Sequence, residues 1–153
     1  MPNSELVKGA GCGTRQWNED FQLTDSSGTA LFSVARTTGA VSMARLAMGV
    51  ETGITAYAGG GQANATALSA TASIHNVTVV GTAADSVKLP AATGSGAIHL
   101  IKNSDAAESL QLFAAATETI DGVASATGVA IAAGKARLVC DIAAGAWVSL
   151  YGA

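Results

Sequence analysis

The chain has 153 residues, of which 49% are hydrophobic, 12% are charged and 5% are aromatic, and its formal net charge is −3. Because the charged share is about half that of an ordinary soluble domain, we expect copies of the chain or a larger assembly to cover part of its surface. The acidic balance and the scattered basic residues argue against binding to nucleic acid or to an anionic membrane surface. The length fits one domain with room for an arm.

Residues 1–18 are predicted to form an extended arm, because glycines loosen the backbone and no helical or strand period appears. The segment also lacks the apolar core of a secretory signal, so we expect synthesis in a reducing cytosol without export. Cys12 and Cys140 are the only cysteines. We therefore expect two reduced thiols, with a single disulfide as the alternative.

Residues 21–43 have the alternation and turn residues of two β-hairpins. The expected strands are Phe21–Leu23, Leu31–Val34 and Val41–Met43. Gly28 and Gly39 lie in the two turns, where a positive φ costs glycine nothing sterically. A short helix over Val41–Val50 is the alternative, since its Ala, Met, Arg and Leu residues favour helix.

The three glycines Gly59–Gly61 are expected to form the hinge between an N-terminal region, residues 1–50, and a β-rich body, residues 51–153. In the body, turn signals recur about every ten residues, which is typical of a β-sandwich or barrel. The expected strands are Ala67–Ala70, Ile74–Val80, Val87–Leu89, Ala97–Ile101, Ser109–Phe113, Thr119–Ile120, Gly128–Ile131, Ala136–Cys140 and Ala146–Tyr151. Segments 87–102 and 129–141 resemble one another, but two such units do not establish a solenoid. The predicted fold is all-β, with a compact sandwich- or barrel-like body and an extended N-terminal arm and hairpin.

No residue pattern predicts catalysis, a metal site or a cofactor. His75 and His99 are the only histidines, and both lie in strand-like segments, where a packed or solvent-facing side chain is expected. The His, Cys, Asp and Glu residues lack the spacing of zinc or calcium ligands. The glycine-rich segment Gly9–Gly13 neither follows a strand nor begins a helix, so a dinucleotide site is not expected. We predict a protein that is not an enzyme and needs no cofactor.

Several segments of the body resemble a module common in virion proteins of tailed bacteriophages, over about residues 53–150. They are Gly59–Leu68, Asn76–Val80, Asp85–Ala91, Thr119–Gly122 and Ala144–Trp147. In addition, Phe21–Gly28, Leu31–Val34 and Thr38–Val41 are similar to the connecting segments of phage fibres. The resemblance implies a β-rich homotrimer on the virion, made in the host cytoplasm.

The resemblance implies two functions. The first is that of a capsid decoration (cement) protein, which binds the major capsid protein on the outer surface of the shell and stabilises it. The alternative is a short head or tail fibre module that attaches to a host receptor or glycan. The length favours decoration, because a receptor-binding fibre usually has a long stem and a distal tip.

On this interpretation the N-terminal region contacts the capsid or a neighbouring subunit. The expected contact residues are Leu6, Trp17, Phe21, Leu31 and Phe32. Trp17 is the expected anchor, because a large aromatic side chain in a flexible arm has no local core to fill; the alternative is a lid over its own hairpin. Trp147 and Tyr151 are expected to pack inside the body. Small-residue strands of the body are expected to form the three-fold seam, which would also cover open strand edges.

Overall fold

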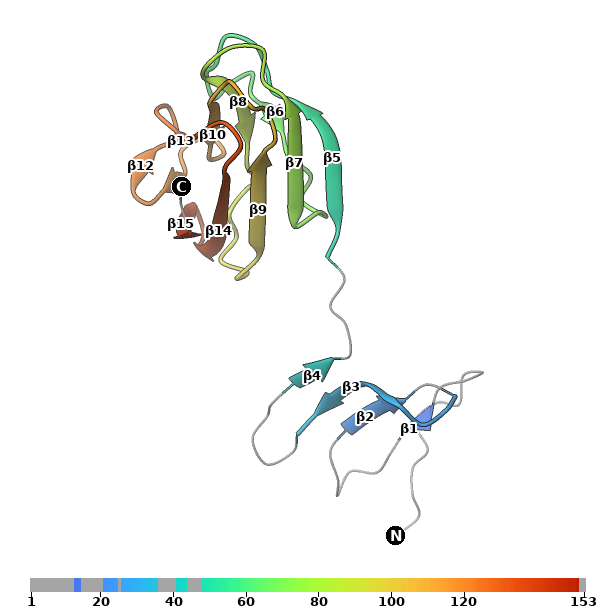
Figure 1. Ribbon diagram of the computed structural model, residues 1–153. Coiled ribbons are helices and arrows are strands. Elements are labelled where there is room, and N and C mark those ends of the chain that lie inside the picture. The colour runs from blue at the N-terminus through green and yellow to red at the C-terminus, as the bar shows by residue number, and fades with distance from the viewer. Residues whose placement is uncertain (1–12, 15–20, 25, 36–40, 44–47, 152–153) are drawn as a thin grey trace. The chain divides into compact units, whose positions relative to one another are not determined.

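The computed structural model describes residues 13–14, 21–24, 26–35, 41–43 and 48–151 (Figure 1). By its internal contacts the chain divides into two units, Met1–Ala47 and Met48–Ala153. In the described residues every regular element is a β-strand. The prediction of an all-β protein is therefore confirmed. The same residues contain no helix of the length and apolar character that crossing a bilayer requires.

The N-terminal unit contains a four-stranded antiparallel sheet in the order β1-β2-β3-β4. Its strands are β1 (Gly13–Thr14), β2 (Phe21–Thr24), β3 (Ala30–Val34) and β4 (Val41–Met43). Between β2 and β3 the chain turns at Gly28, whose φ of 86° is readily adopted only by glycine. The expected hairpins are present, and β4 occupies the start of the segment for which a helix was the alternative. The rest of that segment up to residue 47 lies outside the described residues.

The body is a short β-solenoid, in which the chain passes repeatedly between two facing sheets (Figure 1). The larger sheet has the order β12-β11-β15-β14-β9-β7-β5, and the smaller has the order β13-β10-β8-β6. The body strands are β5 (Val50–Thr55), β6 (Thr66–Ala67), β7 (Ile74–Val79), β8 (Asp85–Lys88), β9 (Ile98–Asn103), β10 (Leu110–Phe113), β11 (Thr119–Ile120), β12 (Val123–Ala124), β13 (Val129–Ile131), β14 (Ala136–Ala143) and β15 (Ala146–Tyr151).

Three coils stack in parallel at the start of the body. In the larger sheet β7 pairs in parallel with β5 and with β9, and in the smaller sheet β8 pairs in parallel with β6 and with β10. Each coil therefore contributes one strand to each sheet. Two side-chain hydrogen bonds between adjacent coils, Glu51–His75 and His75–His99, each join residues that are 24 apart in the sequence.

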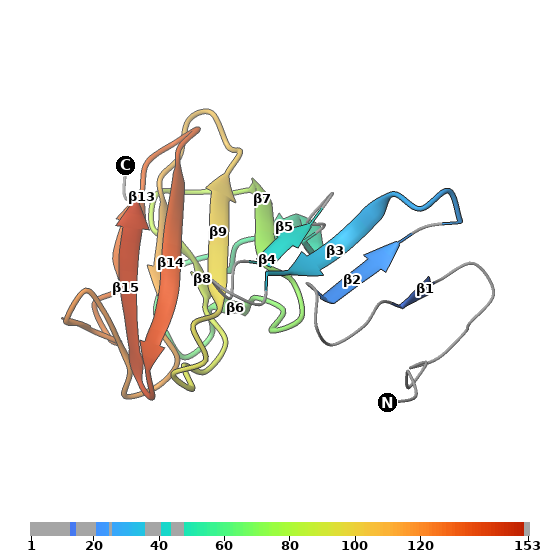
Figure 2. The same ribbon diagram turned by 90° about the horizontal axis from the view of Figure 1, so that it is seen from below.

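After β10 the chain reverses direction. Strand β13 pairs antiparallel with β10, β14 pairs antiparallel with β9, and β15 pairs antiparallel with β14. Figure 2 shows β15, β14, β9 and β7 following one another across the larger sheet. The predicted sandwich or barrel is wrong in its topology, because such folds join antiparallel strands, whereas the first six body strands pair only in parallel with one another. The hinge prediction is also wrong, since Gly59–Gly61 lies inside the first coil, between β5 and β6.

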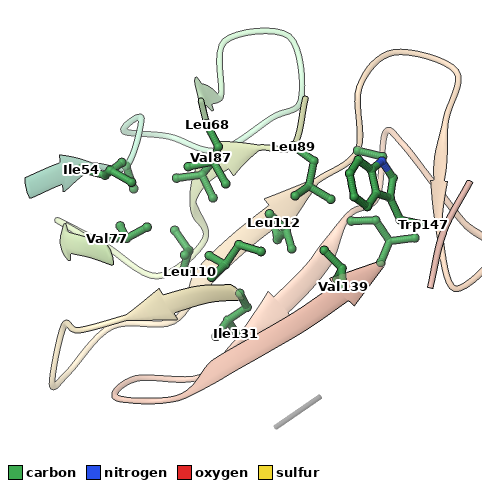
Figure 3. Close-up of a cluster of buried hydrophobic side chains, with 14 of the residues drawn as sticks. Ile54, Leu68, Val77, Val87, Leu89, Leu110, Leu112, Ile131, Val139 and Trp147 are labelled. Carbon is green, nitrogen blue, oxygen red and sulfur yellow. The ribbon is translucent and has the colours of Figure 1, made fainter. Parts of the chain in front are cut away.

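The hydrophobic core lies between the two sheets (Figure 3). Val77, Ile101 and Val139 of the larger sheet have no exposed surface, and neither have Leu110 and Leu112 of the smaller sheet. Most core side chains are aliphatic and of moderate size, so the layer between the sheets is thin.

Trp147 on β15 closes one end of this core and is 2% exposed, as expected from the sequence. The side chain of Tyr151, for which the same position was expected, lies outside the described residues.

The contact between Gly128 and strand β10 gives a test of this packing. A Cβ atom at Gly128 would lie 2.7 Å from the carbonyl oxygen of Leu112, whereas Gly134 has a similar φ of 68° and open space around it. We expect Gly134→Ala to lower the free energy of unfolding by about 1 kcal/mol, from backbone strain alone. Gly128→Ala should lower it by about 3 kcal/mol or more, because overpacking adds to that strain. Urea unfolding of both variants measures the difference, and equal losses would contradict the packing of β10.

Candidate functional site

The larger sheet has one face toward the core and one face outward, and its strands alternate accordingly. On β9, His99, Ile101 and Asn103 are buried, whereas Ile98 and Leu100 point outward and are exposed or half-buried. Residues paired across neighbouring strands share a face, so the outward set can be followed across the sheet from its register.

Two neighbouring rows of this outward set are entirely apolar. One row runs from Val50 through Ile74 and Leu100 to Leu138, and a second row runs from Ile98 through Cys140 to Val148. We call these seven residues, together with Leu150 on the same strand as Val148, the outer apolar face. Val50 is 61% exposed, Leu150 is 54% exposed and Ile98 is 40% exposed. The other five residues are half-buried. Apolar residues gathered in this way on one face of a sheet are typical of an interaction site.

Polar residues border the outer apolar face at one end. Asn76 Nδ2 donates a hydrogen bond of 3.4 Å to Thr52 Oγ1, and Asn76 Oδ1 accepts one of 2.5 Å from Ser104 Oγ. The ammonium group of Lys102 donates to the backbone carbonyl of Gly134. These polar groups therefore bind one another or the backbone, and none of the eight residues of the face is charged.

The inward side of the same strands holds a row of polar side chains, which we call the histidine chain: Glu51 on β5, His75 on β7 and His99 on β9. Glu51 Oε2 lies 2.9 Å from His75 Nδ1, and His75 Nε2 lies 2.9 Å from His99 Nδ1. The two rings are stacked, with centroids 5.1 Å apart and planes inclined by 18°. The histidine chain thus links the three coils through the interior.

The row continues beyond the histidine chain into the last strands. The His99 ring meets the Trp147 ring edge to face, with centroids 5.4 Å apart. Trp147 Nε1 donates to Glu118 Oε2 over 3.2 Å, and Glu118 Oε1 accepts from the backbone amide of Ala92 over 3.0 Å. Every buried side chain in the row therefore has a polar or aromatic partner, as burial of polar groups requires.

The surroundings shift two pKa values in this row. Burial raises the pKa of Glu51, but the hydrogen bond from the Ser69 amide and the hydrogen bond and charge of His75 outweigh it, so the pKa lies below its ordinary value. For His99, burial and the charge of His75 lower the pKa, and the negative charge of Asp141 opposes them only in part. At neutral pH Glu51 is therefore ionised and His99 is neutral.

Two buried aspartates hold turns of the body. Asp141 accepts hydrogen bonds from the backbone amides of Thr93, Gly94 and Ser95 and from the hydroxyl groups of Thr93 and Ser95, at 2.7 to 3.2 Å. Burial opposes ionisation, but these donors hold the pKa of Asp141 far below its ordinary value. Asp85 has the same role toward the amides of residues 59, 81 and 82.

The polar atoms of the histidine chain and of the buried aspartates are engaged in hydrogen bonds within the protein. The ring nitrogens of His75 are both bound within the histidine chain, and the oxygens of Asp141 are saturated by turn donors. In the part of the chain that the structure describes, no three His, Cys, Asp or Glu residues are placed to hold a metal ion. Cys140 is a free thiol on the outer apolar face, while Cys12 lies outside the described residues.

The residues predicted to contact a partner are only partly described. Leu6 and Trp17 lie outside the described residues, and Phe21 lies in β2 with a side chain that is not described. Leu31 is 47% exposed on β3, and Phe32, the next residue, is half-buried. Leu31 is the extra residue of a β-bulge between the pairs Leu23–Phe32 and Thr24–Ala30, so strand alternation does not assign Leu31 and Phe32 to opposite faces. Their contact with a partner stays a prediction.

Sequence reasoning missed both the outer apolar face and the histidine chain. The signal for the chain was the spacing of 24 residues between Glu51, His75 and His99, and the signal for the face was the apolar residue before each of them. Comparisons with protein-family models, with curated proteins and with solved structures found no match to the chain. Its function must therefore be argued from its own residues.

Replacement of the turn aspartate tests how strongly it holds the body. We expect Asp141→Asn to lower the free energy of unfolding by about 3 kcal/mol. The asparagine side chain would place its NH2 group, a hydrogen-bond donor, against backbone N–H groups that are also donors. Ser95→Ala, which removes one donor and leaves the carboxylate, should cost about 1 kcal/mol. Because the pKa of Asp141 is lowered on folding, its contribution is present above the ordinary value of 3.8 and is lost as the pH falls below it. The gap between wild type and Asp141→Asn in urea unfolding should therefore narrow from pH 5 toward pH 2, and a constant gap would contradict this role.

Proposed function

We propose that this chain is a structural protein of a tailed-bacteriophage virion, and that it acts as a capsid decoration protein rather than as an enzyme. The observation that supports assembly most directly is the outer apolar face, with Val50, Ile98 and Leu150 exposed and no charged residue among its eight members. In a free monomer such a face favours aggregation. Coverage by copies of the chain or by a shell removes it from water.

We place the contact between subunits of a homotrimer on this face. Three copies around a three-fold axis bring their larger sheets together, so each outer apolar face packs against two equivalent faces. A standard protein interface buries about 800 Å² on each partner, and burial of apolar surface contributes about 25 cal/mol per Å² before the costs of association. The phage-module resemblance of residues 53–150 supports three copies rather than two.

We assign contact with the major capsid protein to the N-terminal unit. Leu31 and Val41 of its sheet are 47% and 56% exposed. By its internal contacts this unit is separate from the body. A trimer presents three such units to the shell. Three weak contacts made together bind far more tightly than one, and attachment across several capsid subunits stabilises the shell.

A short head or tail fibre module that binds a host glycan is the second candidate. The solenoid supports it, because coils stacked in parallel extend along one axis and each coil contacts only its neighbours. Such a body suits a rigid spacer or tip. An antibody against the chain distinguishes the two by electron microscopy of virions: label on heads supports decoration, label on tail or head fibres supports the fibre module, and unlabelled virions contradict both.

Trimer formation through the outer apolar face has a direct test. We expect the full chain to have three times its monomer mass in light scattering, and Ile98→Lys to yield a monomer, because it places three ammonium groups together at an apolar seam. Ala130→Lys, at an exposed strand position of the smaller sheet, is the matched control and should remain trimeric. Far-UV circular dichroism should be unchanged in both variants. A monomeric wild type would contradict self-assembly, and a trimeric Ile98→Lys would contradict the position of the seam.

A further inference from the structure

We propose that the four-stranded sheet of the N-terminal unit packs, through one apolar face, against the same sheet of other copies of the chain. The inference rests on the self-assembly proposed above and adds a second contact between copies, separate from the outer apolar face of the body.

The register of this sheet gives it one face that is apolar throughout β2, β3 and β4. Residues paired across neighbouring strands share a face, and so do residues two apart on one strand. The positions of this face, which we call the N-terminal apolar face, hold Phe21, Leu23, Phe32, Val34, Val41 and Met43. On the edge strand β1, the position paired with Leu23 is Thr14.

The opposite face of the same three strands is polar. Its central row consists of the paired positions Gln22, Ser33 and Ser42. A sheet with one apolar and one polar face is typical of a layer that has water on one side and packed side chains on the other. The sequence of the sheet therefore requires a second layer against the N-terminal apolar face.

The described part of the N-terminal unit does not supply that layer. Strands β1 to β4 form a single sheet (Figure 1), and the remaining described residues of the unit, 26–29 and 35, flank β3. Val41 is 56% exposed, and Leu23 and Val34 are half-buried. The cover of the N-terminal apolar face thus comes from beyond these residues.

The size of the face indicates what kind of cover fits it. Strands lie about 4.8 Å apart and residues of one face about 6.8 Å apart along a strand, so three strands with two rows have a footprint of roughly 200 Å². A standard interface takes about 800 Å² from each partner. The face is too small to hold two free copies together, but it can pack when another contact already holds the copies.

The length of chain between the two units makes other copies the occupant that meets this condition. Six residues, 44–49, separate Met43 of β4 from Val50 of β5, and a chain of this length spans at most about 25 Å. Val50 belongs to the outer apolar face. Copies joined through that face therefore hold their N-terminal sheets at a high effective concentration for one another.

Identical sheets also match one another chemically. None of the six residues of the N-terminal apolar face is charged, so copies of it meet without bringing like charges together. Facing sheets pack about 10 Å apart with interdigitated side chains. The polar face then remains in water or meets the shell.

Photo-cross-linking of the full chain identifies the surface that covers the N-terminal apolar face. Val41→p-benzoylphenylalanine places a photoreactive group on this face without adding charge, and the group links to the C–H bonds that it contacts. We expect a product of twice the monomer mass on a denaturing gel. Mass spectrometry of that product should locate the link between position 41 of one copy and β2, β3 or β4 of another.

Ser42→p-benzoylphenylalanine is the matched control, because it places the same group at the next residue, on the polar face. It should give little or no product of twice the monomer mass. Equal yields from positions 41 and 42, or links from position 41 to the body or to residues 1–20, would overturn the proposal. Light scattering of the same variants separates the two levels of failure: a trimer without links between N-terminal sheets overturns this contact alone, whereas a monomer overturns self-assembly as well.

Discussion

Parallel stacking of coils is the constraint on which the rest of the body depends. Because each coil repeats the path of the one before, side chains at matching positions lie against one another across strand pairs. An inward position is therefore a row through the protein, and a polar residue in it must bind the next member of the row. Glu51, His75 and His99 meet this requirement with hydrogen bonds of 2.9 Å, while Val77 and Ile101 fill a neighbouring apolar layer.

The turns of the body contain backbone N–H groups that also need hydrogen-bond partners, and buried carboxylates accept these hydrogen bonds. Asp141 binds three consecutive backbone amides and Asp85 binds another three. A turn without such an acceptor would leave N–H groups unpaired beside the core, at a cost of about 1–3 kcal/mol each. Turn geometry and strand position are thus coupled, because each aspartate lies on a strand and reaches into the loop beside it.

Much of the strand content could be predicted from the sequence, because alternation of apolar and polar residues is a local signal. Strands such as Ile74–Val79 and Leu110–Phe113 were expected within one residue of their bounds. The pairing of strands could not be predicted, since parallel and antiparallel ladders need the same alternation and differ only in which distant segment lies alongside. Strand β5 was missed because Gly53 interrupts it, and a turn of the first coil was mistaken for a hinge because it consists of Gly59–Gly61.

Several of the few charged side chains of this protein are buried in the body and are therefore absent from its surface. The chain has 11 acidic residues, and Asp85, Glu118 and Asp141 are buried in turns and in the interior row. Their carboxylates fix the backbone and give the surface little repulsion between molecules. The larger sheet then presents Val50, Ile98 and Leu150 to solvent in two rows of residues without charge. The acids that fix the turns of the body are therefore not available to give charge to its surface, and this is the physical basis on which we propose assembly.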